Sequence, residues 1–439
     1  MKIAIFTDVF LEVPGGIPSS ISAQKKSLEA LGHKVIVFCP GWRGTSVRKG
    51  IAVVPTMPKW LKINGAPMSR GPKTVEKWVV ERYPEFSKFD IIHVHYEASC
   101  SIAGVRLARR FNIPLVQTMH GREDMAVGVN VPHPFKTLTG TVLNFLHGRY
   151  IPHTVTVSRD DYLAPTVARA KMWTLMVNHA NAADEVVTPS THFANKLKHY
   201  GVKKPIFVVS NGVSDELIRE FDIRALRRAE ESKISTATAV TKNSATVSLE
   251  KVLVRRREPG EPLRMIWNSR VSHEKRIMSF LKAIAEMKEP VKVSVYGDGN
   301  AYAQAKRFIE KKGLPVTLYG LTSHDKILDK MASEHLGVMA SYGFDTQGLT
   351  LLESEATGLP VFYVDPDMRE IVPRAGAVWS GPKPSEMARR LDKLAREPKR
   401  IEEMSREMLS CRREVFQSTQ IAKLIEVYKK LISSRGRLK

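Results

Sequence analysis

Short apolar runs alternate with amphipathic stretches through the first half of the chain. Runs of this length, bounded by turn residues, are typical of buried strands, and the stretches between them have helical spacing. The runs are KIAIF (2–6), KVIVFC (34–39), FDIIHVH (89–95), PLVQTMH (114–120), EVVTPS (185–190) and IFVVSNG (206–212). Because these strands are apolar on both faces, they predict a parallel sheet covered by helices on both sides.

A second series of the same kind begins near residue 263. Its apolar runs are LRMIWNS (263–269), VKVSVYG (291–297), VTLYG (316–320), LGVMAS (336–341) and PVFYVD (360–365). Helices are expected at 277–287, 301–312, 324–334 and 348–357, and a charged helical segment from 384 to 432. We therefore expect an α/β protein with two Rossmann-like, doubly wound domains that face each other across a cleft.

Residues 225–262 interrupt this alternation. They contain the polar, β-branched stretch ESKISTATAVTKNSATVS between two basic flanks. Such a composition predicts a partly mobile insertion rather than a core element. The expected domains are then 1–205 and 206–416, with this insertion in the second, followed by a C-terminal helix at 417–439.

Composition narrows the class of protein. The chain has 439 residues, of which 43% are hydrophobic, enough for two ordinary domains. Its three cysteines, at 39, 100 and 411, have no paired spacing, which argues against a disulfide framework or zinc site and favours a reducing compartment. No signal peptide and no apolar run of about 20 residues is recognised, so we expect a cytoplasmic protein without membrane spans.

The formal net charge of +23 is spread over both halves of the chain. A basic surface attracts polyanions, either nucleic acid or anionic lipid. No zinc-finger spacing or RNA-binding aromatic pattern is present, so nucleic acid is the weaker candidate.

The stretch SYGFDTQGLTLLESEATGLP (341–360) carries the strongest chemical signal. Asp345 and Glu353 lie eight positions apart around Gly348, which opens an expected helix. Uncovered amide groups at a helix start attract phosphate, and Glu353, roughly a turn and a half further on, suits a ribose. The alternative is an ordinary amphipathic helix capped by Asp345 or Thr346.

Two cations follow the first strand of the second series. Arg270 and Lys275 in NSRVSHEK are placed to neutralise a pyrophosphate and stabilise a departing nucleoside diphosphate. The alternative is an exposed pair on a loop. The Asp-Pro-Asp triplet at 365–367 lies in a turn after a strand, and no metal site is assigned to it.

These stretches together resemble the retaining glycosyltransferases with an "E, seven residues, E" motif, a large family that includes sucrose synthase and bacterial mannosyl- and glucosyltransferases. Arg270 and Lys275 match the family's G-R-x-x-x-E-K element, whereas Asp345 stands where the family usually has Glu. The resemblance implies the GT-B fold, a nucleotide-sugar donor, and a last helix that returns to the N-terminal domain. It implies no tightly bound cofactor, with Mg²⁺ at most stimulatory.

The resemblance also implies roles for particular residues. The catalytic group would be His120, Arg270, Lys275 and Asp345. The donor would contact Gly15, Gly16, Asn211, Gly320, Leu321, Thr346, Gln347, Gly348, Leu349, Thr350 and Glu353. The acceptor side would contain His95, Glu123 and Asp124.

Two details point to the acceptor. DTQGLT (345–350) is similar to the ETQGLT form of bacterial diacylglycerol glucosyltransferases, and HGREDM (120–125) matches their His-x-x-Glu-Asp stretch. The resemblance favours transfer of glucose from UDP-glucose to diacylglycerol. Transfer to a soluble glycan, with GDP-mannose as a further donor candidate, stays open, and so does a non-enzymatic protein that binds anionic lipid or nucleic acid.

Residues 58–88 interleave aromatic and basic side chains, as interfacial helices on anionic lipid do. About half a dozen basic residues would suffice to hold an enzyme on the inner face of the cell membrane. The expected contacts are Lys59, Trp60, Lys62, Lys73, Lys77 and Trp78. The alternative is an ordinary amphipathic helix with Trp78 in the core, and residues 136–151 form a second candidate for membrane or acceptor contact.

Overall fold

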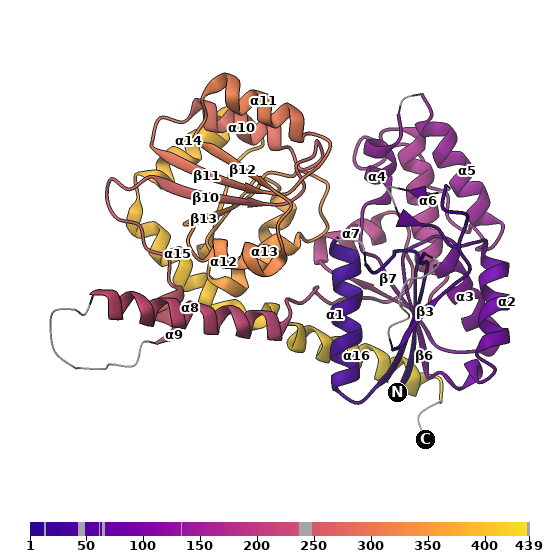
Figure 1. Cartoon of the computed structure of the whole chain (residues 1–439). Coiled ribbons are helices and arrows are strands. Elements are labelled where there is room, and N and C mark those ends of the chain that lie inside the picture. Colours follow the sequence, from indigo (N-terminus) through magenta and orange to yellow (C-terminus); the bar gives the residue numbers. More distant parts are fainter. Residues whose placement is uncertain are drawn as a thin grey trace. The chain divides into compact units, whose positions relative to one another are not determined.

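The computed structural model describes residues 1–12, 15–42, 49–60, 62–63, 66–132, 134–236 and 248–436. The chain divides into two compact units, Met1–Asn211 with Gln420–Lys439, and Gly212–Thr419. Each unit contains a parallel sheet flanked by helices (Figure 1). The predicted α/β class with two doubly wound domains is therefore confirmed.

The described part of unit 1 contains a seven-stranded sheet in the order β3-β2-β1-β6-β7-β8-β9. Its strands are β1 (Lys2–Thr7), β2 (Lys34–Cys39), β3 (Ile51–Val53), β6 (Ile91–His95), β7 (Leu115–Thr118), β8 (Glu185–Thr188) and β9 (Ile206–Val208). Its helices are α1 (Gly16–Ala30), α2 (Pro72–Arg82), α3 (Ser99–Phe111), α4 (Glu123–Asn130), α5 (Lys136–Gly148), α6 (Val167–Asn181) and α7 (Thr191–His199). All strand pairs in this sheet are parallel.

The register of three neighbouring strands determines which loops meet in unit 1. Thr7 pairs with His95, and His95 pairs with Thr118. The residues that follow β1, β6 and β7 therefore emerge side by side at the carboxyl edge of the sheet, where ligands bind in folds of this type.

The described part of unit 2 contains a six-stranded parallel sheet in the order β12-β11-β10-β13-β14-β15. Its strands are β10 (Leu263–Asn268), β11 (Val291–Tyr296), β12 (Val316–Gly320), β13 (Leu336–Met339), β14 (Val361–Tyr363) and β15 (Ala377–Trp379). Its helices are α8 (Asp215–Thr236), α9 (Leu249–Leu253), α10 (Ile277–Glu286), α11 (Tyr302–Lys312), α12 (His324–Met331), α13 (Leu349–Thr357), α14 (Pro384–Ala395) and α15 (Pro398–Cys411). Strands β10 and β13 pair directly, so the loops after them lie at one edge.

The last helix, α16 (Gln417–Ser434), begins in unit 2 and continues in unit 1. Its apolar face, with Leu424 and Tyr428 fully buried, packs in one cluster with Ile3 and Ile5 of β1. The hydroxyl of Tyr428 also lies 2.6 Å from Nδ1 of His93 in β6. This helix therefore covers one face of the unit 1 sheet.

The structure differs from the expected domain organisation at two places, the end of the first domain and the insertion. Strand β9 pairs with β8 in the first sheet, so unit 1 extends to Asn211 rather than to residue 205. Parts of the expected insertion at 225–262 are helical, because α8 continues to Thr236 and α9 spans Leu249–Leu253. Residues 237–247 lie outside the described part of the chain.

The expectation of one interfacial helix across 58–88 is wrong. The structure has a short hairpin, β4 (Lys62–Ile63) with β5 (Ala66–Pro67), before α2, which spans only Pro72–Arg82. Val75 and Val79 of α2 are fully buried in the core of unit 1, and Trp78 packs against that core. The spacing of these residues makes α2 an ordinary covering helix, the alternative considered for this segment.

Of the other residues expected on the membrane, Lys59 and Trp60 are exposed in the turn before the hairpin, and Lys73 and Lys77 are exposed on α2. Lys62 lies in β4, and its side chain is outside the described part of the chain. Across the described residues, no helix is both long and apolar enough to span a bilayer.

Candidate functional site

The loop after β13 leads into α13 through Gly348. This residue is the N-cap of the helix, has φ of +77°, and no side chain forms a capping hydrogen bond there. The positive φ favours glycine, and a Cβ atom at this position would lie 2.7 Å from Cε at the end of the Met339 side chain. The carboxylate of Asp345 contacts Lys275 and Ser341, and the positive end of α13 suits an anion.

Lys275 and Asp345 form an ion pair beside this helix start. Nζ of Lys275 lies 2.5 Å from Oδ1 of Asp345, and the other carboxylate oxygen accepts a hydrogen bond from Ser341 at 2.5 Å. Both side chains are largely shielded from water. Lys275, Ser341 and Thr350 line a small pocket with Trp267. The structure thus brings together two of the residues expected to be catalytic.

Arg270 lies on the same loop as Lys275 but faces solvent. Its side chain is 63% exposed, and its guanidinium lies 3.0 Å from the carboxylate of Glu274. The next cation, Arg276, has φ of +61° and donates to the carbonyl oxygen of Pro382 at 2.6 Å. Arg270 is therefore accessible to a ligand, whereas Arg276 holds the loop to a neighbouring segment.

Glu353 is held by two elements. Its carboxylate accepts a hydrogen bond from Asn268 at the end of β10, 3.2 Å away, and lies 2.7 Å from Nε2 of His324 on α12. The hydrogen bond to Glu353 raises the pKa of His324 above its ordinary value. The carboxylate expected to bind ribose is thus fixed at the carboxyl edge of the unit 2 sheet.

The loop between β12 and α12 adjoins Glu353 through His324. Gly320 has φ of +70°, Leu321 is strongly exposed, and Tyr319 stacks on Tyr296 with ring centroids 4.6 Å apart. An exposed apolar side chain near the carboxylate that is expected to bind ribose suits a nucleoside base.

The other residues of unit 2 that are expected to contact the donor differ in exposure. Thr346 and Gln347 are buried, whereas Leu349 and Thr350 are half-buried in the first turn of α13. Contacts from this loop to a diphosphate would therefore come mainly from backbone amide groups.

In unit 1, α1 begins with Gly15 and Gly16. Gly15 is the N-cap in an extended conformation, with φ of 167°, and no side chain caps the helix. Ser20 of α1 donates a hydrogen bond of 2.7 Å to Asn211. The two glycines and Asn211 therefore belong to one local arrangement around the start of α1.

His120 and His95 are in contact at the carboxyl edge of the unit 1 sheet. Nε2 of His120 lies 2.7 Å from Nδ1 of His95, and His95 is fully buried. Burial lowers the pKa of His120 to about 4 and that of His95 well below its ordinary value. Both rings are neutral at pH 7, and His95 can act on a ligand only through His120.

Carboxyl groups gather beside these histidines. Asp8, directly after β1, accepts hydrogen bonds from the amides of Cys100 and Ser101 at the start of α3. Tyr96, with φ of +119°, donates its hydroxyl to Glu123 at 2.8 Å. Burial raises the pKa of Glu123 to about 7 and also raises that of Glu97 and Asp8. Part of this cluster is therefore protonated at neutral pH.

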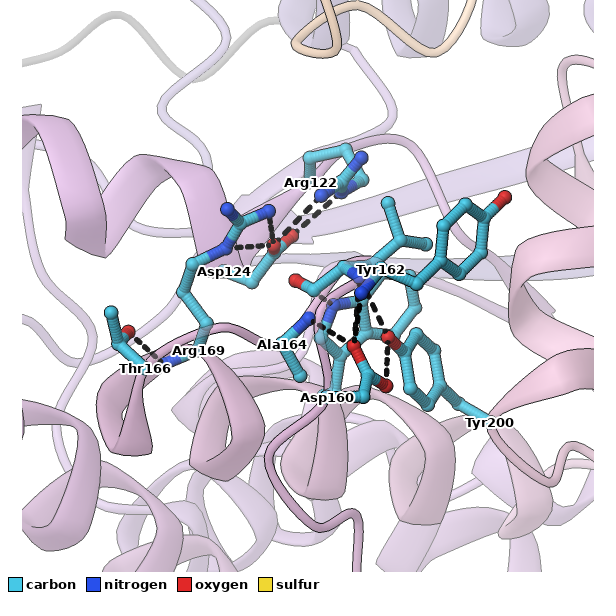
Figure 2. A network of polar contacts seen from close by, with 10 residues as sticks. Arg122, Asp124, Asp160, Tyr162, Ala164, Thr166, Arg169 and Tyr200 are labelled. Carbon is cyan, nitrogen blue, oxygen red and sulfur yellow. Dashed lines mark hydrogen bonds and ion pairs between the residues drawn. The ribbon is translucent and has the colours of Figure 1, made fainter.

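Asp124, expected on the acceptor side, is fully buried between two arginines (Figure 2). Arg122 donates to it at 2.7 and 2.9 Å, and Arg169 of α6 at 2.9 and 2.8 Å. This carboxylate ties α4 to α6, so its geometry is that of a structural residue and it does not face an acceptor directly.

The sequence pattern did not indicate Asp8, Tyr96, Asn268 or His324. Asp8 could have been found, because it directly follows the first buried strand. Tyr96 and Asn268 have no signal in the sequence, since their roles depend on contacts with residues far along the chain. The described residues contain no group of three or more His, Cys, Asp or Glu that could hold a metal ion.

Two family models match consecutive parts of the chain. Glycosyltransferase Family 4 matches residues 14–217, and Glycosyl transferases group 1 matches residues 251–408. Together with the two doubly wound units, these matches confirm the predicted class. The chain belongs to the family-4-like glycosyltransferases with the GT-B fold.

Relatives and solved structures agree with this assignment. The chain is 24% identical to alpha-monoglucosyldiacylglycerol synthase of Streptococcus pneumoniae over 371 residues, 82% of this chain and 70% of that protein. The enzyme of that name from Acholeplasma laidlawii is 31% identical over 123 residues, 27% of this chain and 30% of that protein.

Two solved structures are similar over almost the whole chain. Sucrose-phosphate synthase from Thermosynechococcus elongatus has a TM-score of 0.67 at 15% identity, with 99% of each chain covered. Anabaena Alr3699/HepE in complex with UDP-glucose has a TM-score of 0.62 at 16% identity, with 97% of this chain and 100% of that chain covered. At these identities the likeness shows the fold.

Proposed function

We propose that this glycosyltransferase moves glucose from UDP-glucose to diacylglycerol with retention of the anomeric configuration. The observation that carries the proposal is the start of α13 at Gly348 beside the Lys275–Asp345 pair. The names of the two relatives support the lipid acceptor, and the UDP-glucose complex of a protein with this fold supports the donor.

The donor diphosphate would bind at the start of α13, where the helix dipole and backbone amides favour an anion. Lys275 and the exposed Arg270 would neutralise the charge that develops on the departing diphosphate. Glu353, held by Asn268 and His324, would accept hydrogen bonds from the ribose hydroxyls. Leu321 and Gly320 would lie by the base.

In the proposed reaction, the bond between C1 of glucose and the diphosphate oxygen breaks. The acceptor hydroxyl oxygen bonds to C1 on the same face of the sugar, and its proton passes to the departing diphosphate. Asp345 would orient the sugar through its hydroxyl groups. The roles of Gly15, Gly16, Asn211 and His120 toward the donor stay predictions.

The acceptor-side roles also stay predictions. Glu123 is half-buried and has a pKa of about 7, so it can accept or donate a hydrogen bond to a lipid hydroxyl near neutral pH. His95 would act by orienting His120.

A panel of labelled nucleotide sugars tests this function. The full chain is incubated with UDP-glucose, UDP-galactose or GDP-mannose and diacylglycerol in detergent micelles, and glycolipid and released nucleotide are measured. We expect an α-glucosyl lipid from UDP-glucose. Product only with a soluble sugar acceptor, a preference for GDP-mannose, or no turnover of any donor would refute the proposal.

A further inference from the structure

Helix α5 packs against the protein with its small and polar residues, whereas an ordinary amphipathic helix packs with its apolar side. The residues it turns toward the protein are small or polar. Gly140 is buried so close to α6 that a Cβ atom there would lie 3.1 Å from the carbonyl oxygen of Ala168. Asn144 donates a hydrogen bond of 2.8 Å to the carbonyl of Lys171, and buried His147 lies 2.9 Å from His179. Polar contacts therefore hold α5 to α6.

The large apolar residues of α5 face outward instead. These side chains, together with Phe135 just before the helix, are 39–65% exposed, and we call them the α5 apolar face. They are Phe135, Leu138, Val142, Leu143, Phe145 and Leu146. A contiguous apolar surface of this kind on a protein marks an interaction site, because leaving it in water is unfavourable.

The charges around this face favour an anionic partner. No aspartate or glutamate occurs between Asp124 and Asp160, whereas Lys136 and Arg149 flank the two ends of α5. A second copy of the chain would bring the same cations face to face, which is unfavourable. A surface of anionic lipid headgroups over an apolar interior complements both the charge and the apolar face.

The length of α5 determines whether it could span a bilayer or lie at its surface. Its 13 residues extend about 20 Å, too short to cross a hydrocarbon core of about 30 Å. A helix of this length with one apolar face lies in the plane of the interface.

Arg106 of α3 links α2 to the segment just after α5. Arg106 pairs with Glu76 of α2 at 2.6 Å, and its guanidinium lies 5.8 Å from the ring centroid of Tyr150, two residues after α5. Lys73 and Lys77 are exposed on α2.

We propose that the α5 apolar face docks in the plane of an anionic lipid bilayer, with Lys136 and Arg149 at headgroup level. The inference rests on the proposed function, because a diacylglycerol acceptor has to be taken from a membrane. It moves the main membrane contact from residues 58–88 to α5.

The test compares two double variants of the full chain in sedimentation with phosphatidylcholine vesicles that contain or lack phosphatidylglycerol. In Leu138→Gln/Phe145→Gln, two outward side chains of α5 become polar. In Leu31→Gln/Val208→Gln, the same change is made at two exposed apolar positions elsewhere in unit 1. We expect the wild type to bind the anionic vesicles, the α5 variant to bind at least about tenfold more weakly, and the control to bind like the wild type.

Three results would overturn the proposal. These are equal binding by the α5 variant and the wild type, equal loss in both double variants, and sedimentation of the wild type as a dimer that only the α5 variant converts to a monomer. UDP-glucose binding, measured on all three proteins by calorimetry, checks that the variants are folded and should not change.

Failure of the proposed function gives a different pattern. If no glucolipid forms in micelles but vesicle binding still depends on α5, the acceptor assignment is wrong and the docking surface stands. If glucolipid forms in micelles and the α5 variant binds vesicles like the wild type, the docking surface is wrong and the function stands.

Discussion

Asp345 stands at a position where the family motif usually has glutamate, and its carboxylate contacts both Lys275 and Ser341. A side chain one methylene shorter keeps the ion pair tight, at 2.5 Å. The ammonium group of Lys275 is therefore neutralised by a fixed partner until a ligand anion competes for it.

This contact predicts opposite effects on binding and turnover in Asp345→Asn. Loss of the carboxylate frees the charge of Lys275, so UDP should bind about tenfold more tightly. Turnover should fall about 10²-fold, because the variant loses the carboxylate that holds Lys275 and that we propose orients the sugar. Calorimetry with UDP and initial rates with UDP-glucose measure the two effects.

Ser341→Ala is the matched control, since it removes one hydrogen bond to Asp345 and keeps the charge. It should change both quantities only a few-fold. Unaltered turnover in Asp345→Asn would contradict a role for this carboxylate in catalysis.

At the scale of elements, the start of α13 depends on one glycine. Gly348→Ala places a methyl group against Met339 and forces an L-residue to positive φ, so unit 2 should lose about 2–4 kcal/mol of unfolding free energy. UDP affinity should fall as well, because the helix start is displaced. Urea denaturation and calorimetry measure these changes.

Gly313→Ala separates the effect of backbone strain from the effect of the contact with Met339. Gly313 ends α11 with φ of +59°, and a Cβ atom there would meet nothing within 4 Å. This variant should cost only about 1 kcal/mol and bind UDP normally. Equal losses in the two variants would show that backbone strain alone, and not the contact with Met339, determines the effect.

The buried strands of both sheets could be predicted from the sequence, because they are apolar on both faces and end in turns. KVIVFC matches β2 residue for residue, and VTLYG matches the edge strand β12 in the same way. The short edge strands β3 and β15 were not predicted, since three residues beside solvent leave no distinct pattern. The helix opened by Gly348 was predicted because glycine and flanking acids mark it locally.

Burial of a helix face was harder to predict. Aromatic and basic residues in 58–88 indicated a membrane helix, but the spacing of Val75 and Val79 directs α2 into the core. In α5 the periodicity shows which residues share a face, not which face points inward. That orientation depends on Gly140 and Asn144 fitting against α6, a contact between segments about thirty residues apart.

Contacts in the site were beyond sequence reasoning for the same reason. Lys275 and Asp345 are 70 positions apart, and Asn268 and Glu353 are 85 positions apart. The motif places each residue at a strand end, but only the order of β10 and β13 in the sheet brings them together.

At the scale of the whole molecule, the two units should respond differently to acid. Burial lowers the pKa of seven described histidines in unit 1 below the ordinary value of 6.5. They are His33, His93, His95, His120, His147, His153 and His179. In unit 2, only His335 is lowered among the described residues, and His324 is raised.

A histidine with a lowered pKa binds more protons when unfolded, so its contribution to stability is lost as pH falls below about 6.5. Buried acids with raised pKa, such as Glu97 and Glu123, oppose this trend but are fewer. Unit 1 should therefore unfold at a lower temperature at pH 5 than at pH 7, with a smaller change for unit 2. Calorimetry at both pH values tests this, and an equal shift in the two units would contradict it.

The path of α16 has a consequence for how the protein is made. The face of the first sheet that holds Ile3 and Ile5 is covered by Leu424 and Tyr428, residues that leave the ribosome some four hundred positions later. Unit 2 is translated completely before that cover exists. Unit 1 is thus mostly synthesised first but finishes folding last. During translation its uncovered sheet is the surface most in need of a chaperone.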